Sequence, residues 1–164
     1  MAAKSTESNQ VKTIRFYSNL ILHRMDGPAI IWPDGDAEWW IDGERIGMLQ
    51  HLPELHISSI HRFKNGLLHR EDGPAVIYSN GRKEWYLNGM PHRSGGPAQY
   101  CNDIEYWYQY GCLHREDGPA IIYPSGMEEW WVNDELHRED GPAIISWDGR
   151  KEWWINGKRR KDLE

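Results

Sequence analysis

Cysteine, phenylalanine and long apolar runs are scarce in this sequence of 164 residues. The two cysteines, Cys101 and Cys112, are too few for a disulfide framework and fit a reducing compartment. The turn expected near Asn102–Asp103 does not lie midway between them, so we expect no cross-strand disulfide. No apolar run approaches the roughly 20 residues of a membrane span. The opening residues, MAAKSTESNQVK, lack the apolar core of a secretory signal, which predicts a cytoplasmic protein.

An excess of basic residues is also absent. Lys and Arg number 19 against 25 Asp and Glu, which gives a net charge of −6 and argues against non-specific nucleic-acid binding. Hydrophobic residues make up 39% of the chain and include ten Trp and eight Tyr but only two Phe. Each aromatic side chain buries a large area, so a few of them can stabilise a thin fold.

A repeat of 22 or 23 residues runs through the sequence. Its first word, His-Arg-x-x-Gly-Pro-Ala, begins at His23, His69, His92, His114 and His137. Its second word, an aromatic pair followed by Asn-Gly or a relative, ends at Leu20, Gly43, Gly66, Gly89, Gly111, Asp134 and Gly157. A fixed period of this length indicates a repeat architecture. We therefore expect a disordered tail, one repeat domain and a basic tail, at 1–11, 12–157 and 158–164. The domain divides into the units 20–42, 43–65, 66–88, 89–110, 111–133 and 134–156.

Each regular unit predicts a β-hairpin. A loop such as LHREDG leads into a short strand such as PAIIY, then a turn such as Ser79-Asn80-Gly81, then a second strand such as EWWIN. Turn words between β-rich segments are a strong hairpin signal, and no segment shows a helical period. The predicted fold class is therefore all-β: an elongated, single-layer antiparallel sheet of about six repeated hairpins, each packed on its neighbours.

Two units depart from the pattern. Unit 43–65 lacks the His-Arg word, and the segment 46–63 in its place is expected to bulge out or to form a short helical turn. Unit 89–110 carries HRSGGPA, in which Ser94 and Gly95 replace the usual acids, and its hairpin is one residue short. Tyr106 also replaces the Glu that precedes the aromatic pair elsewhere.

The word order resembles the MORN repeat, in which an aromatic residue and Gly alternate with a small basic loop and a closing Asp-Gly. The aromatic part of that pattern is matched by Trp39–Gly43, Trp85–Gly89, Trp130–Asp134 and Trp153–Gly157, and its closing turn by Trp32–Gly35 and Tyr123–Gly126. The connecting loop departs from the family, which favours His-Gly-x-Gly. The likeness, over about 12–157, is to variants found in phage, giant-virus and bacterial proteins, some of them described as antitoxins. The resemblance implies a sheet used for protein or membrane-surface contacts and brings no catalytic residues.

The histidines, acids and arginines of the repeated words look at first like catalytic or metal-binding groups. A word present in most units is better explained by what each unit needs structurally. Equivalent loops two strands apart are separated by about 9.6 Å, too far for equivalent residues to share one zinc ion. The spacing of His51, His56 and His61 gathers no ligands on a helix or on a strand. We therefore expect no metal, no cofactor and no enzyme activity.

Unit 89–110 is the candidate site. Without neighbouring acids, Arg93 is the best candidate to bind an anion or an acidic side chain, and a degenerate loop is the alternative. The most aromatic stretch of the chain lies beside it, and Tyr, Trp and Arg dominate binding hot spots. The predicted partner-binding residues are His92, Arg93, Tyr100, Tyr106, Trp107, Tyr108 and Tyr110. The irregular segment 46–63 is the second candidate surface.

Three functions fit these features. The first is a protein-binding module that occupies another protein, plausibly a phage- or bacterium-derived inhibitor or antitoxin acting in the cytoplasm, the host's if phage-encoded. The second is a structural scaffold or self-assembling module, with a homodimer through an exposed sheet edge. The third is capture of a nucleotide or sugar near Arg93. Loss of binding on substitution of Arg93 or Trp107 is expected for the first and third but not for the scaffold.

Overall fold

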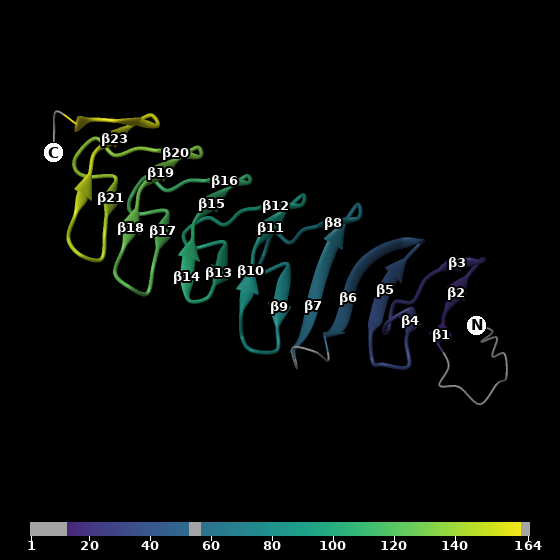
Figure 1. Cartoon of the computed structure of the whole chain (residues 1–164). Coiled ribbons are helices and arrows are strands. Elements are labelled where there is room, and N and C mark those ends of the chain that lie inside the picture. The colour runs from purple at the N-terminus through teal and green to yellow at the C-terminus, as the bar shows by residue number, and fades with distance from the viewer. Residues whose placement is uncertain (1–12, 53–56, 162–164) are drawn as a thin grey trace. The chain divides into compact units, whose positions relative to one another are not determined.

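The computed structural model describes residues 13–52 and 57–161, with side chains described at 13–50 and 59–161. The expected tail at 1–11 and the last residues of the basic tail, 162–164, lie outside the described residues. The chain divides into two compact units, Met1–Lys83 and Glu84–Glu164, which are described separately below (Figure 1). No α-helix occurs in the described ranges, and none of their segments is a helix that could cross a membrane.

The first unit is a meander of antiparallel strands. They pair in the order β1-β4-β5-β6-β7-β9, while β8 pairs with β7 and β2 with β3. Their bounds are β1 (Ile14–Arg15), β2 (Tyr17–Ser18), β3 (Ile21–Leu22), β4 (Ile30–Ile31), β5 (Ala37–Ile41), β6 (Glu44–Leu52), β7 (Ile57–Lys64), β8 (Leu67–Leu68) and β9 (Val76–Tyr78). The boundary between the units falls inside β10 (Lys83–Glu84).

The second unit contains a six-stranded sheet in the order β13-β14-β17-β18-β21-β22 and four separate two-stranded hairpins. The strands of the sheet are β13 (Gln99–Cys101), β14 (Ile104–Tyr106), β17 (Ile121–Ile122), β18 (Glu128–Glu129), β21 (Ile144–Ile145) and β22 (Lys151–Glu152). The hairpins are β11 (Tyr86–Leu87) with β12 (Met90–Pro91), β15 (Tyr108–Gln109) with β16 (Cys112–Leu113), β19 (Trp131–Val132) with β20 (Glu135–Leu136), and β23 (Trp154–Ile155) with β24 (Lys158–Arg159).

The all-β, repeated-hairpin fold class is confirmed, and the sequence reading missed a second hairpin in each regular repeat. In repeat 111–133, β17 and β18 form the predicted hairpin. The predicted second strand then breaks at Trp130, whose N–H leaves its own hairpin and donates to the Ala143 carbonyl at 2.8 Å. Beyond the break, β19 and β20 form a hairpin around Asn133-Asp134. Both turn residues have positive φ, as a two-residue hairpin turn requires.

The recurrence of the first word along the chain has one structural explanation, which is an arginine folded back onto an aromatic ring. In repeat 111–133, the Arg115 guanidinium lies 3.6 Å from the Trp107 ring centre. It also donates from Nε to Asp117 at 2.8 Å and from Nη1 to the Pro119 carbonyl at 3.2 Å. A Cβ at Gly118 would lie 2.7 Å from the Arg115 Cζ, so only glycine fits beneath the folded arginine.

The alanine that closes the word supplies a thin core. This residue is fully buried in all five copies, Ala29, Ala75, Ala98, Ala120 and Ala143. Its N–H and carbonyl hold adjacent strands together, as where Ala120 N–H donates to the Glu129 carbonyl at 2.8 Å and its own carbonyl accepts from Trp107. A larger side chain has no room at this position, which explains why the word ends in Ala.

The expectation of a bulge or helical turn at 46–63 is wrong for the described residues, which continue as the paired strands β6 and β7. The register runs from Gly47 opposite Arg62 to Leu52 opposite Ile57, and β7 continues the sheet by pairing with β9. Residues 53–56 lie outside the described residues. The lost His-Arg word is therefore replaced by a long hairpin within the sheet.

Substituting Gly118 by Ala is expected to destabilise the protein by about 1–3 kcal/mol, because the new Cβ pushes the Arg115 guanidinium off the ring and away from its acceptors. Denaturant unfolding of Gly118→Ala, Arg115→Ala and the double variant forms a cycle that isolates this clash. In the Arg115→Ala background the glycine substitution should have little further effect. An equal loss in both backgrounds would contradict the proposed packing.

The arginine pairs predict a specific acid sensitivity. The Arg115 guanidinium holds the pKa of the exposed Asp117 carboxyl below its ordinary value of 3.8, first through the hydrogen bond and then through its charge. A lowered pKa in the folded state stabilises the protein above the ordinary pKa, and this contribution is lost as the pH falls through the folded-state value. The Tm of the wild type should therefore exceed that of Asp117→Asn at pH 7, and the difference should shrink towards pH 2. A difference independent of pH would rule out an ionic contribution.

Candidate functional site

The loop of repeat 89–110 keeps the folded-back arginine. Arg93 lies 3.8 Å from the centre of the Trp85 ring and donates from Nη1 to the Pro97 carbonyl at 3.1 Å. A Cβ at Gly96 would stand 2.7 Å from the Arg93 Cζ, as at the equivalent glycine of the next repeat. The aromatic stack, the carbonyl contact and the glycine are therefore all in place, and this loop is not a degenerate copy.

The loop lacks the carboxylate that completes the arrangement in other repeats. Arg24, Arg70, Arg115 and Arg138 each donate from Nε to an Asp two residues later, at 2.8 Å in each case. In this loop Gly95 takes the place of that Asp and adopts a φ of +74°. Among the described residues, the Nε–H of Arg93 has no acceptor. The Nε–H of Arg93 is therefore available to bind an acceptor, whereas the same group of the other four arginines is already bonded to an Asp.

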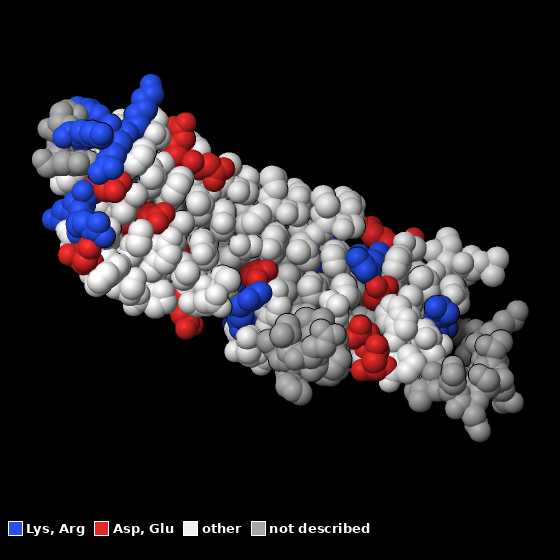
Figure 2. All heavy atoms as spheres, viewed as in Figure 1, with Lys and Arg blue, Asp and Glu red and all other residues white. Residues whose placement is uncertain are grey.

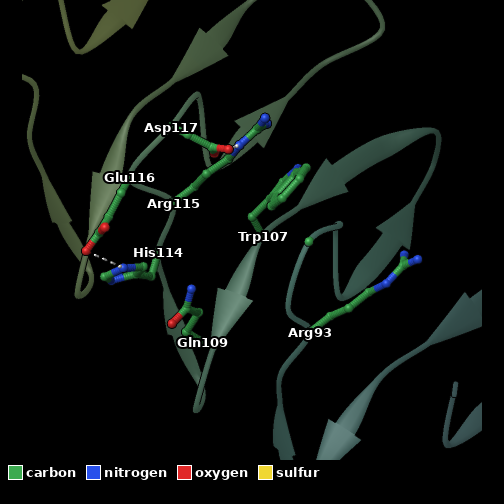
Figure 3. Close-up of a pocket in the computed structure, with 8 residues that line it drawn as sticks. Arg93, Trp107, Gln109, His114, Arg115, Glu116 and Asp117 are labelled. Atoms are coloured by element: carbon green, nitrogen blue, oxygen red, sulfur yellow. Dashed lines mark hydrogen bonds and ion pairs between the residues drawn. The ribbon is translucent and has the colours of Figure 1, made fainter. Parts of the chain in front are cut away.

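A groove of about 280 Å³ lies between this loop and the loop of the next repeat (Figure 3). Its lining residues are Arg93, Gly95, Trp107, Gln109, His114, Arg115, Glu116 and Asp117. Figure 3 shows Trp107 between the two loops, with the Arg93 side chain extending away from it. On the far wall, Arg115 is paired with Asp117, and Nε2 of His114 lies 3.7 Å from Glu116. The groove thus combines one aromatic wall with charges of both signs.

Tyr110 and His92 form a separate aromatic contact at the tip of the β15–β16 hairpin. Their ring centres are 4.2 Å apart, and the Tyr110 N–H donates to Nδ1 of His92 at 3.1 Å. Burial lowers the pKa of His92, which favours the neutral imidazole that this hydrogen bond requires. Tyr110 is 62% exposed and has a φ of +48°.

Tyr106 and Tyr108 are placed together but away from Trp107. Side chains alternate along a strand, so these two tyrosines share one face while Trp107, between them, packs beneath Arg115 on the other. Their rings are nearly parallel with centres 6.3 Å apart. In most other repeats the residue in the place of Tyr106 is a Glu that accepts from the second aromatic ring, as Glu129 does from Trp131 at 2.8 Å.

These phenols remain protonated at neutral pH. Burial is the main cause that raises the pKa of both Tyr106 and Tyr108. In the next repeat, burial and the charge of Glu129 raise the pKa of Tyr123 to about 12, and its hydroxyl donates to Glu129 at 3.0 Å. The tyrosine face is therefore suited to packing and hydrogen-bond donation rather than to proton transfer.

The seven predicted residues thus occupy four places instead of one. Arg93 and Trp107 line the groove, His92 and Tyr110 form the hairpin tip, and Tyr106 and Tyr108 lie on the opposite face. Tyr100 is half-buried in β13, opposite Glu105 of β14. Sequence reasoning missed Gln109 and the loop from His114 to Asp117, because the intact word was assigned a purely structural role.

Among the described residues, no group of three His, Cys, Asp or Glu side chains is arranged to hold a metal ion. Cys101 and Cys112 are both free thiols, as predicted. What the groove and the hairpin tip offer is a directed guanidinium N–H, an exposed phenol and an aromatic wall, which are binding groups.

The chain matches no protein-family model, and no curated protein is significantly similar to it.

Proposed function

We propose that this protein is a non-enzymatic binding module that occupies another protein stoichiometrically, with repeat 89–110 as its contact surface. The observation that carries the proposal is Tyr110, a 62% exposed aromatic side chain at the tip of a two-residue turn. Every other repeat places a small polar residue at this turn position: Asn19, Asp42, Asn65, Asn88, Asn133 and Asn156.

Tyrosine is a poor choice for this position on grounds of stability. All of these turn residues have φ near +50°, a conformation that Asn and Asp tolerate and that costs other residues about 1–2 kcal/mol. The ring contacts His92 but remains 62% exposed, so its burial compensates for this cost only in part. Backbone strain of this kind is characteristic of functional sites, so we infer that Tyr110 is retained for contact with a partner.

Arg93, in the same repeat as Tyr110, also supports a protein partner. Arg93 offers an Nε–H without an acceptor, in the geometry that an Asp carboxylate satisfies in other loops. An Asp or Glu side chain of the partner would complete this arrangement through a charge-assisted hydrogen bond. Tyr110 is exposed and Arg93 is half-buried, and Tyr and Arg are among the residues that dominate binding energy at protein interfaces.

The groove favours a protein side chain over a small molecule. Its volume of about 280 Å³ falls at the lower limit of typical ligand pockets, which are about 300–1,000 Å³. Paired charges line one wall, whereas small-molecule sites are mostly apolar. The proposal includes a relationship to the MORN repeat, which the repeat pattern supports, and it extends to an inhibitory role in the cytoplasm.

Replacing Tyr110 by Asn should move stability and binding in opposite directions. The variant restores the residue that suits the turn, so we expect the free energy of unfolding to rise by about 1 kcal/mol. The same change removes the exposed ring and should weaken partner binding at least about 10-fold. Denaturant unfolding and binding titration measure the two effects. Retained affinity would remove Tyr110 from the contact surface.

Arg93→Gln and Arg138→Gln form a matched pair. Both variants lose a guanidinium stacked on a tryptophan, over Trp85 and Trp130 respectively, but Arg138 already has its own Asp140. In affinity capture from a lysate of the source organism, the wild type and Arg138→Gln should each retain the same partner at one-to-one stoichiometry, and Arg93→Gln should not.

Trp107→Ala is an unsuitable test, because the Trp107 ring also supports Arg115 and its loss would disturb the fold. Equal recovery by the two arginine variants would contradict the assignment of the site. Recovery of no partner, with saturable binding of a nucleotide or sugar to the wild type, would favour small-ligand capture instead.

A further inference from the structure

A second departure from the repeat lies in the first unit, at Arg62 in β7. Its N–H donates to the Ala75 carbonyl at 2.8 Å, and its carbonyl accepts from His69 N–H at 3.0 Å. Trp107 makes the same two bonds, with the corresponding alanine and histidine of the repeat that follows it, Ala120 and His114. Arg62 therefore occupies the backbone position that elsewhere carries the aromatic ring beneath the folded arginine.

The arginine that folds over this position is Arg70, and it is folded as in the other repeats. It donates from Nε to Asp72 at 2.8 Å, and a Cβ at Gly73 would lie 3.1 Å from its Cζ. Arg70 is therefore folded over a backbone position that carries an arginine, where other repeats carry an aromatic residue. Burial, and then the charge of Arg70, lowers the pKa of Arg62.

No carboxylate among the described residues forms an ion pair with Arg62; its own hydrogen bond is from Nη1 to the backbone carbonyl of His61 at 3.3 Å. The acids of the adjoining loop have other partners. Asp72 pairs with Arg70, and Glu71 lies 3.3 Å from both Lys64 and His69. The half-buried Arg62 charge is therefore unbalanced locally, an arrangement that is unfavourable without a counter-charge.

Gly47 stands next to Arg62 on one side, and a Cβ there would lie 3.7 Å from Nη1 of Arg62. Trp39, Gly47 and Arg62 are register partners across β5, β6 and β7. Gly47 stands eight residues after Trp39, the interval at which Arg24 follows Phe16 and Arg93 follows Trp85. Here the arginine is absent, so no side chain from β6 lies between the Trp39 backbone and Arg62.

We propose that Arg62 and Arg70 form an anion-binding site that takes a carboxylate or phosphate group. A guanidinium binds such oxyanions through two parallel N–H donors, and two adjacent guanidinium groups provide donors from both sides. The bound anion would supply the counter-charge that Arg62 lacks, while Asp72 keeps Arg70 in place. The site lies in the first unit and is independent of the contact surface proposed for repeat 89–110.

The test is thermal unfolding of the full chain at constant ionic strength, with chloride replaced stepwise by inorganic phosphate or by a short tetraglutamate peptide. Binding to the folded state alone predicts a rise in Tm that grows with the logarithm of the ligand concentration and reaches roughly 5–10 °C at about 100 times Kd. The two arms distinguish the sources: response to phosphate only indicates a phosphate group, and response to the peptide only indicates an acidic side chain.

Arg62→Trp is the matched variant, since it restores the ring found beneath arginine in other repeats. It should unfold at a higher Tm than the wild type in chloride. Its Tm should show no specific rise with phosphate or with the peptide. The general salting effect of phosphate on stability remains in this variant and serves as the baseline. Arg62→Gln, which keeps a polar side chain, should lose the response as well and covers the case in which the tryptophan fails to pack.

Two results would overturn the proposal. One is a wild type whose Tm responds to neither anion beyond the response of Arg62→Trp. The other is a rise in Tm with phosphate or with the peptide that is as large in both Arg62 variants as in the wild type, which would place the anion elsewhere on the chain.

Discussion

The fold depends on a guanidinium group held flat against an aromatic ring. Each repeat has little core beyond one buried alanine, so the arginine stem and the ring beneath it provide much of the packing. This one contact dictates the surrounding residues: glycine where Arg115 crosses the chain, a carbonyl at Pro119 to accept its Nη1, and a carboxylate at Asp117 to orient its Nε. The repeated word is the list of residues that this contact requires.

Because each member of the word has an assigned role, each departure from it has a predictable physical consequence. Removal of the carboxylate at Gly95 leaves a charged N–H donor on Arg93 without its acceptor. Replacement of the ring by Arg62 leaves a half-buried positive charge without a counter-ion. The two departures differ in chemistry, but both leave an arginine without a carboxylate partner among the described residues. The chain as a whole is acidic, with a net charge of −6, so these two arginines differ from most of the charged groups around them.

The period, the hairpins and the turns could be predicted from the sequence because local chemistry sets them. The turn expected near Asn102–Asp103 is one example, and both residues have positive φ in the structure. The break in the second strand could not be predicted from the sequence, because it depends on a non-local contact: the Trp130 N–H donates to the Ala143 carbonyl of the next repeat. The long β6–β7 hairpin was missed for a related reason: residues 46–63 lack the repeated words, and their register is set by pairing with β5 and β9.

The candidate site was identified in part, because departures from a repeat are visible in sequence but their geometry is not. Arg93 and Tyr110 were found from composition, whereas strand alternation separated Trp107 from Tyr106 and Tyr108. The repeat also explains why a short, irregular loop can bind. Backbone hydrogen bonds to both neighbouring strands, from Arg93 N–H to the Tyr108 carbonyl and from Trp85 N–H to the Ala98 carbonyl, hold it in place. A loop ordered by its neighbours loses little entropy on binding, so a few exposed groups suffice for affinity.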